Sequence, residues 1–174
     1  GGVDIDPDSI KTFQKNFPKS KAICESLLEY SDEKIIEDFG GEEIDIVVGG
    51  PPCQGFSSAN RWQKENEDPR NKLFFEYLRF VELLKPKAVV IENVRGILTR
   101  DNGFAKSRIE KLLKDLGYNV DCEVLNASDY GVPQNRLRAF FVAIRNDYKE
   151  TFDFDQLIKK QKVTVKEAIG ELYD

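Results

Sequence analysis

Strand-like and helix-like patterns of apolar residues alternate along the chain. Strand-like segments occur at 3–5, 22–24, 44–48 and 87–94. The last shows no alternation of apolar and polar residues, as expected for a strand that helices cover on both faces. Between these segments, apolar residues recur at the three- and four-residue spacing of a helix face. This order of elements predicts a doubly wound α/β fold with a mostly parallel sheet.

The predicted helices are marked by their apolar stripes. Asp6 can cap a helix that begins at Pro7 and buries Ile10, Phe13 and Phe17. The strongest stripe consists of Phe74, Tyr77, Leu78, Val81 and Leu84. Shorter stripes are Ile35, Ile36 and Phe39 before Gly40, and Ile109, Leu112, Leu113 and Leu116 before Gly117. Two later strands are predicted at 118–127 and 137–145.

Three residues with reactive or acidic side chains fall where predicted strands end. Residues 49–71 have no hydrophobic period and form a long predicted loop, a kind of segment that is usually functional or disordered. Cys53 lies at its start, while Asp4 and Glu92 close two other strands. Ligands of doubly wound folds bind beyond the carboxyl ends of the strands, so these positions are the first candidates for a site.

Composition limits the classes of protein to which the chain can belong. With 174 residues, of which 40% are hydrophobic, the chain fits one globular domain. Its apolar runs are too short for a membrane span and no secretory leader opens it, which predicts a cytoplasmic protein without a membrane partner. The net charge of -5 encodes no general attraction for phosphate. A start at "GGVDID" without methionine predicts a fragment.

The cysteine and histidine counts exclude several chemistries. Three cysteines without a CxxC pair argue against a disulfide framework and a structural zinc site, and no metal site is predicted. The chain has no histidine, so it cannot build a Ser-His-Asp or Cys-His site. If Cys53 is a nucleophile, its substrate must therefore be an electrophile that is activated by proton donation.

Cys53 and Glu92 each have a structural and a functional interpretation. A free cysteine is most often a buried small hydrophobe, yet Pro51, Pro52 and the neighbouring glycines would present this thiol at a strand-to-loop corner. An isolated glutamate usually pairs with a lysine or caps a strand. Burial at the tip of an apolar strand would instead keep Glu92 protonated, as a general acid requires.

The arginines and Asp4 are open to the same two interpretations. Arg136 and Arg138 stand two apart, hence on one side of an extended segment, either as a solvated basic patch or as paired donors to a carbonyl or phosphate. Asp4 either supports an ordinary helix cap or accepts hydrogen bonds from ribose hydroxyls.

Together these motifs resemble the cytosine-C5 DNA methyltransferases of bacterial modification systems. "GGPPCQGFS" resembles the proline–cysteine loop of that family, "ENV" its glutamate motif, "QNRLR" its Gln-x-Arg-x-Arg motif and "VDIDPDSIKTFQKNFP" its second cofactor segment. The resemblance runs from about Val3 to Arg145. It implies the S-adenosylmethionine-dependent methyltransferase fold, with residues 1–174 as part of the catalytic domain.

The resemblance implies a role for each motif residue. Cys53 would attack carbon 6 of a cytosine flipped out of double-stranded DNA, and Glu92 would donate a proton to ring nitrogen 3. Arg138 would hold the cytosine carbonyl, and Arg136 would orient the loop. The substrate-binding residues would be Gln54, Ser57, Arg61 and Gln134. S-adenosylmethionine, the implied cofactor, would be bound by Asp4, Ile5, Glu25, Pro52 and Leu73.

The chain departs from the family pattern at its ends. The glycine-rich first cofactor motif would precede Gly1, and the target-recognition region would follow about residue 174. The resemblance also implies a restriction endonuclease as a candidate partner. Two alternatives stay open: a non-catalytic or complementing subunit of a split methyltransferase, and a tRNA cytosine-C5 methyltransferase. Adenine amino-methyltransferases are disfavoured, because Cys53 stands where they carry an aromatic residue.

Overall fold

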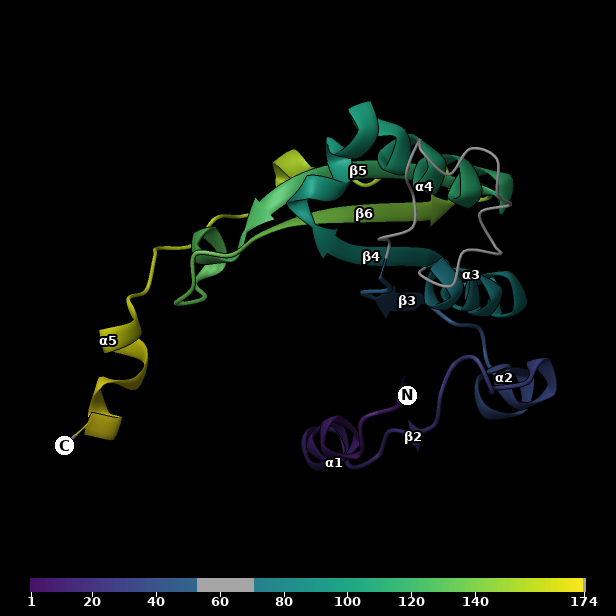
Figure 1. The fold of residues 1–174 in the computed structure, drawn as a ribbon, viewed down its shortest axis with the longest axis horizontal. Coiled ribbons are helices and arrows are strands. Elements are labelled where there is room, and N and C mark those ends of the chain that lie inside the picture. Colours follow the sequence, from purple (N-terminus) through teal and green to yellow (C-terminus); the bar gives the residue numbers. More distant parts are fainter. Residues whose placement is uncertain (53–70, 174) are drawn as a thin grey trace.

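The structure, a computed structural model, describes residues 1–52 and 71–173 (Figure 1). Four predicted site residues, Cys53, Gln54, Ser57 and Arg61, lie outside this described part. The strands are β1 (Gly2–Asp4), β2 (Ala22–Cys24), β3 (Ile46–Gly49), β4 (Ala88–Val94), β5 (Tyr118–Asn126) and β6 (Leu137–Arg145). The α-helices are α1 (Pro7–Asn16), α2 (Asp32–Phe39), α3 (Lys72–Leu84), α4 (Phe104–Asp115) and α5 (Val165–Ile169).

The strands form two sheets, and the predicted α/β class is confirmed. β1 pairs with β2 and β3 pairs with β4, both in parallel. β6 lies between β4 and β5 and runs antiparallel to both. The parallel pairs thus lie within residues 2–94, and the two later strands add the antiparallel pairs. The β5–β6 connection, 127–136, is shorter than the crossover of about a dozen residues that a parallel pair needs, so these strands pair antiparallel.

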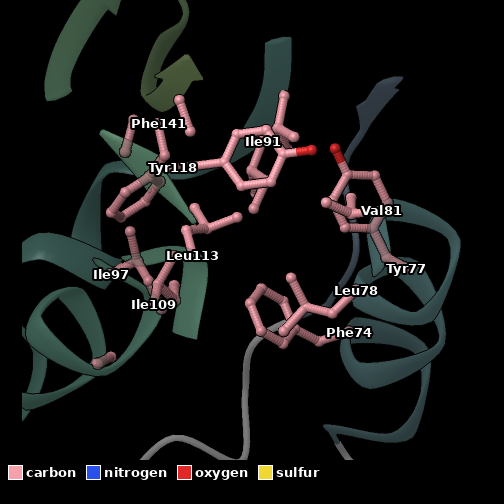
Figure 2. Packing of buried hydrophobic residues seen from close by; sticks show 14 residues of the cluster. Phe74, Tyr77, Leu78, Val81, Ile91, Ile97, Ile109, Leu113, Tyr118 and Phe141 are labelled. Carbon is pink, nitrogen blue, oxygen red and sulfur yellow. The ribbon is translucent and has the colours of Figure 1, made fainter. Parts of the chain in front are cut away.

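The larger hydrophobic core lies between the four-stranded sheet and helices α3 and α4. Figure 2 shows Phe74 and Val81 of α3 on one side of it and Ile109 and Leu113 of α4 on another. Tyr77 is buried here, and its hydroxyl donates to the carbonyls of Val47 (3.1 Å) and Val90 (3.0 Å). This side chain therefore fixes α3 against the parallel pair β3–β4.

A smaller core joins the N-terminal sheet to α2 and α3. Its buried centre is Tyr30, Ile35 and Phe80, with Val3 and Ile23 packed against it from β1 and β2. Arg79 of α3 adds polar contacts with the same segment. Its guanidinium donates to the carbonyls of Tyr30 (2.5 Å) and Leu27 (3.3 Å) and pairs with Asp32. The two-stranded sheet is thus attached mainly through one face of α3.

The predicted burial of the first helix is wrong. Asp6 caps α1 and Pro7 begins it, as expected, but Ile10 and Phe13 are only partly covered and Phe17 is exposed. The reason is the small area beneath the helix, because β1 and β2 are three-residue strands. A narrow two-stranded sheet cannot cover a stripe of that length.

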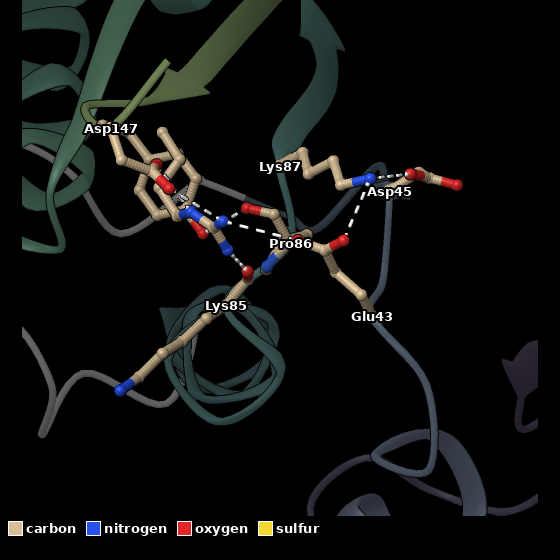
Figure 3. Close-up of polar contacts among 8 residues, drawn as sticks. Glu43, Asp45, Lys85, Pro86, Lys87 and Asp147 are labelled. Carbon is tan, nitrogen blue, oxygen red and sulfur yellow. Dashed lines mark hydrogen bonds and ion pairs between the residues drawn. The ribbon is translucent and has the colours of Figure 1, made fainter.

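A charged network holds the amino end of β4. Figure 3 shows Lys87 between Glu43 (3.1 Å) and Asp45 (2.8 Å). Arg145, at the end of β6, pairs with Asp147 at 2.8 Å and donates to the carbonyl of Lys85. Exposed ion pairs are each worth only up to about 1 kcal/mol. The network therefore serves to align β3, β4 and β6 at the end opposite Glu92.

Candidate functional site

Glu92 and Arg138 meet at one rim of the four-stranded sheet. In the β4–β6 register, Glu92 lies opposite Phe140 and Val94 lies opposite Arg138. Glu92 and Arg138 are therefore diagonal neighbours on the same face. Arg138 Nε lies 2.9 Å from Glu92 Oε1, and Arg136 Nη2 lies 3.6 Å from the same oxygen. Three of the predicted catalytic residues are thus brought together.

The predicted burial of Glu92 in an apolar environment is wrong. Its side chain is 34% exposed, and the groups beside it are two guanidiniums. The sequence pattern suggested burial because the strand before Glu92 is apolar on both faces. The guanidiniums of Arg138 in β6 and of Arg136, the residue before β6, pair with the carboxylate instead.

The backbone that leads to Cys53 runs beside Glu92. A Cβ atom at Gly50 would lie 3.4 Å from Glu92 Oε2, so the backbone of Gly50 is close to the carboxylate. Asn93 Nδ2 donates to the carbonyl of Pro51 at 2.9 Å. Asn93 therefore fixes the start of the segment that contains Cys53. Sequence reasoning missed this role, although a polar residue at the end of an apolar strand was a usable signal.

Asn126, at the end of β5, holds the turn that carries the arginine motif. Its Oδ1 accepts from the backbone N–H of Arg136 at 3.1 Å, and its Nδ2 donates to Asn135 Oδ1 at 2.8 Å. Gln134 is exposed on this turn. Asn126 was also missed, because nothing in the sequence marks a side chain that accepts from a backbone N–H ten residues away.

All five residues predicted to bind a cofactor line one pocket of about 580 Å³. They come from four places in the chain: Asp4 and Ile5 at the end of β1, Glu25 after β2, Pro52 after β3, and Leu73 in the first turn of α3. Gly49, Gly50 and Pro51 line the pocket as well. Gly50 thus lines the pocket and also lies close to the Glu92 carboxylate.

The pocket offers apolar surface and two carboxylates. Asp4 Oδ1 accepts from the Asp6 N–H at 2.9 Å, and its other carboxylate oxygen can accept from a ligand. Glu25 accepts from Lys34 Nζ at 2.8 and 3.1 Å, and this hydrogen bond raises the pKa of Lys34. Ile5 is exposed, so its side chain can make an apolar contact with the face of an aromatic ring of a ligand. This combination of carboxylate acceptors and apolar side chains fits a nucleoside, whose ribose hydroxyls can donate hydrogen bonds.

Two other classes of site were searched for in residues 1–52 and 71–173. No cluster of three or more cysteine or acidic residues there is arranged to hold a metal ion. No helix in this part of the chain has the length and apolar composition of a membrane span.

Comparison with known proteins identifies the family. The sequence model of the family of C-5 cytosine-specific DNA methylases matches residues 1–174. The chain belongs to this family. Among similar methylases are the type II methyltransferases M1.HphI of Haemophilus parahaemolyticus, 38% identical over 97% of this chain, and M.FnuDI of Fusobacterium nucleatum, 39% identical over 94%.

Solved structures agree with this methylase assignment. One, described as a DNA modification methyltransferase encoded within an Escherichia coli prophage, superposes with a TM-score of 0.76 and 33% identity over 96% of this chain. The S. pombe Dnmt2 methyltransferase, 21% identical with a TM-score of 0.63, shares the fold. The methylase chain spans 45% of the length of M1.HphI, 46% of M.FnuDI and 46% of the prophage protein.

Proposed function

We propose that the whole protein transfers a methyl group from S-adenosylmethionine to carbon 5 of cytosine in double-stranded DNA. The observation that carries the proposal is the meeting of Glu92 with Arg138 at 2.9 Å and Arg136 at 3.6 Å, beside the backbone that leads to Cys53. Gly50, which lies close to the Glu92 carboxylate, also lines the nucleoside-sized pocket. A base and a methyl donor would thus be bound near the same segment.

In the proposed reaction, Cys53 and Glu92 activate the cytosine ring together. The Cys53 thiolate forms a bond to carbon 6, while Glu92 donates a proton to ring nitrogen 3. This addition makes carbon 5 nucleophilic, so that it can take a methyl group. Loss of the proton from carbon 5, return of the proton on ring nitrogen 3 to Glu92 and departure of the Cys53 thiolate restore the aromatic ring.

Arg138 would hold the cytosine carbonyl oxygen through a hydrogen bond from its guanidinium, whose Nε lies 2.9 Å from Glu92 Oε1. The carbonyl oxygen and ring nitrogen 3 of the base would thus face neighbouring side chains. Arg136 would orient the loop, with exposed Gln134 as support.

The pocket lined by Asp4, Ile5, Glu25, Pro52 and Leu73 would hold the cofactor. Asp4 would accept from the ribose hydroxyls, Glu25 from the adenine amino group, and the apolar side chains would pack on the base. S-adenosylmethionine bound there would supply an electrophilic methyl group. Gln54, Ser57 and Arg61 would contact the DNA around the flipped cytosine, and a restriction endonuclease of matching specificity would be the partner of the whole protein.

The covalent step is tested by trapping the whole protein on DNA that contains 5-fluorocytosine, in which the final proton cannot leave. We expect an adduct that survives denaturation in the wild type and none with Cys53→Ser. Glu92→Gln should slow methylation by a factor of about 100 or more, because it withholds the ring proton. Retained turnover by the serine variant would disprove the covalent mechanism.

Cys122 provides the matched control for this trap. Burial raises the pKa of the Cys122 thiol to about 11, so only about one thiol in a thousand is ionised at pH 8. Cys122→Ser should therefore leave both trapping and methylation unchanged. An adduct mapped to Cys122 by mass spectrometry would reject the assignment of Cys53.

The second candidate function is that of one part of a split methyltransferase, which needs a complementing polypeptide. The chain spans 45% of M1.HphI and 46% of M.FnuDI. We expect the 174-residue chain alone to be inactive. Restoration of activity by a second polypeptide would favour the split enzyme. A transfer-RNA substrate is less well supported, because the family that matches the chain is that of the C-5 cytosine-specific DNA methylases.

A further inference from the structure

Glu25, which lines the pocket just after β2, is held by a lysine of the next helix. Lys34 Nζ lies 2.8 Å from Oε1 and 3.1 Å from Oε2 of Glu25, so both carboxylate oxygens accept from one ammonium. The two residues come from different elements, nine positions apart in the chain. Lys34 itself does not line the pocket. The contact of Lys34 with the pocket therefore runs through Glu25.

The position of Lys34 is fixed by its surroundings. Lys34 belongs to the first turn of α2, where its backbone N–H donates to Ser31 Oγ at 3.3 Å. Its ammonium lies 5.6 Å from the centre of the Tyr30 ring, within the range of a cation–π contact. Tyr30 is buried at the centre of the smaller core. The cation that holds Glu25 is thus anchored to a helix cap and to a core aromatic ring.

The backbone of Glu25 is fixed relative to Asp4, the other carboxylate of the pocket. The Glu25 N–H donates to the carbonyl of Asp4 at 3.1 Å. In the parallel β1–β2 pair, Asp4 lies opposite Cys24, the residue before Glu25. Asp4 and Glu25 therefore stand at the carboxyl ends of adjacent strands. With its backbone and both carboxylate oxygens held, Glu25 presents a fixed acceptor to the pocket.

The ion pair of Lys34 with Glu25 affects orientation more than stability. The side chains are 51% exposed for Lys34 and 28% exposed for Glu25. Pairs that water reaches contribute little to the stability of a fold, because solvent screens the two charges. The consequence of the pair that matters for a ligand is therefore the direction in which the Glu25 carboxylate points.

A carboxylate held in this way can distinguish purine bases. An ionised carboxylate has about four lone-pair sites and no proton to donate, and Lys34 occupies one site on each oxygen. The remaining sites can accept from an amino group at carbon 6 of a purine. A purine with a carbonyl oxygen at carbon 6, such as hypoxanthine, would place two acceptors against each other. Unpaired polar groups of this kind give strong discrimination between ligands.

We infer that Lys34 is a positioning residue that makes the pocket selective for 6-aminopurines, by holding the Glu25 carboxylate in one orientation. The inference rests on the proposed function, because it takes an adenosine compound as the occupant of the pocket. It adds a residue from outside the pocket to those that determine which base is bound. Without Glu25, Lys34 would have no effect on this choice.

The test compares two ligands of the whole protein. They are S-adenosylhomocysteine, which methyl transfer leaves behind, and S-inosylhomocysteine, in which a carbonyl oxygen replaces the amino group at carbon 6. Isothermal titration calorimetry gives both dissociation constants, and their ratio is the selectivity of the pocket. We expect the wild type to bind the adenosyl compound at least about tenfold more tightly, because the inosyl compound leaves acceptors unpaired.

Substitutions at Lys34 should change this ratio according to their hydrogen bonds. Lys34→Met keeps an unbranched side chain but cannot donate, so it should lower the ratio by about fivefold or more. Lys34→Arg can still donate to both oxygens and should retain most of the selectivity. Urea unfolding of the methionine variant should stay close to that of the wild type, because the pair is partly exposed.

Two control variants separate positioning from a general loss of charge or structure. Lys111→Met removes an exposed ion pair with Asp115 on α4 and should leave both dissociation constants unchanged. Glu25→Gln provides an amide that can either accept or donate, so it should abolish the preference for the amino group. Adding Lys34→Met to the glutamine variant should then change the ratio no further.

The outcomes distinguish this inference from the proposed function. If the wild type binds neither compound, the pocket is not an adenosine site and both are rejected. Equal binding of the two compounds by the wild type would reject the inference alone. The same holds if Lys34→Met keeps the full ratio, weakens both compounds equally, or has no greater effect than Lys34→Arg or Lys111→Met.

Discussion

A carboxylate and two guanidiniums from distant parts of the chain meet at one rim of the sheet. The contact of Glu92 with Arg138 is a direct result of the antiparallel pairing of β4 and β6, which places the two residues diagonally on one face. Asn93 and Asn126 act on the neighbouring backbone, at Pro51 and Arg136. The geometry of the site thus depends on two asparagines whose hydrogen bonds described above hold the backbone and not the Glu92 carboxylate.

At the scale of single residues, replacing Asn126 should lower the rate of methylation strongly and the stability of the fold only slightly. Asn126→Ala removes an acceptor for Arg136 N–H and a donor to Asn135, which should cost about 1 kcal/mol of the free energy of unfolding. Because the turn then loses its fixed position, methylation by the whole protein should fall by about tenfold or more. Urea unfolding and initial rates on DNA measure the two effects.

Two further variants make that test specific. Asn126→Asp keeps the oxygen that accepts from Arg136 N–H and should retain more activity than the alanine variant. Asn119→Ala alters an exposed asparagine at the start of the same strand and should change neither quantity. Equal activity of the Asn126→Ala variant and the wild type would remove Asn126 from the site.

At the scale of elements, β3 depends on a glycine beneath an aromatic ring. A Cβ atom at Gly49 would lie 2.5 Å from the ring of Tyr77, which is buried and hydrogen-bonded to β3 and β4. The ring cannot move aside without breaking those hydrogen bonds. The residue before Gly50 is therefore restricted to glycine by packing.

Gly49→Ala should accordingly destabilise the chain by about 1–3 kcal/mol, the usual cost of overfilling a core. Gly41→Ala is the matched control, because a Cβ atom there would meet no atom within 4 Å. Thermal or urea unfolding compares the two variants. A loss of stability in the control as large as that of Gly49→Ala would show that the effect comes from the glycine backbone and not from Tyr77.

Elements with a strong hydrophobic period could be predicted from the sequence, and interactions across elements could not. The stripe of α3 and the uninterrupted apolar strand at β4 are confirmed, because burial alone determines their patterns. The stripe of α1 has the same period, but whether it is buried depends on the area of sheet beneath it. The burial of Glu92 failed for a similar reason, since the arginines beside it come from β6 and from the turn before it. The predicted roles of Cys53 and Gln54 remain predictions.

At the scale of the whole molecule, the interior is divided into two cores of unequal size. The larger unites α3, α4 and the four-stranded sheet, whereas the smaller attaches β1 and β2 to α2 and α3. Arg79 spans the boundary through its contacts with Leu27, Tyr30 and Asp32. One wall of the pocket, at Asp4 and Ile5, belongs to the smaller unit.

This division predicts two levels of hydrogen exchange in the isolated chain. Amides of β1 and β2 should exchange through an opening of lower free energy than those of β4 and β6, because fewer buried contacts hold the smaller unit. Arg79→Lys, which cannot reproduce the forked donors, should lower protection in β1 and β2 and leave β6 unchanged. Equal protection of both sheets would show a single cooperative unit.

The diagonal placement of Glu92 and Arg138 also limits how the length of this chain can vary. Side chains of a strand alternate between faces, so one residue inserted between Arg138 and Arg145 would turn the guanidinium to the opposite side of the sheet. The same insertion at Gly131, before the strand, would leave that geometry intact. In homologous sequences, insertions and deletions should therefore be confined to the turn before β6 and be absent from β6 itself.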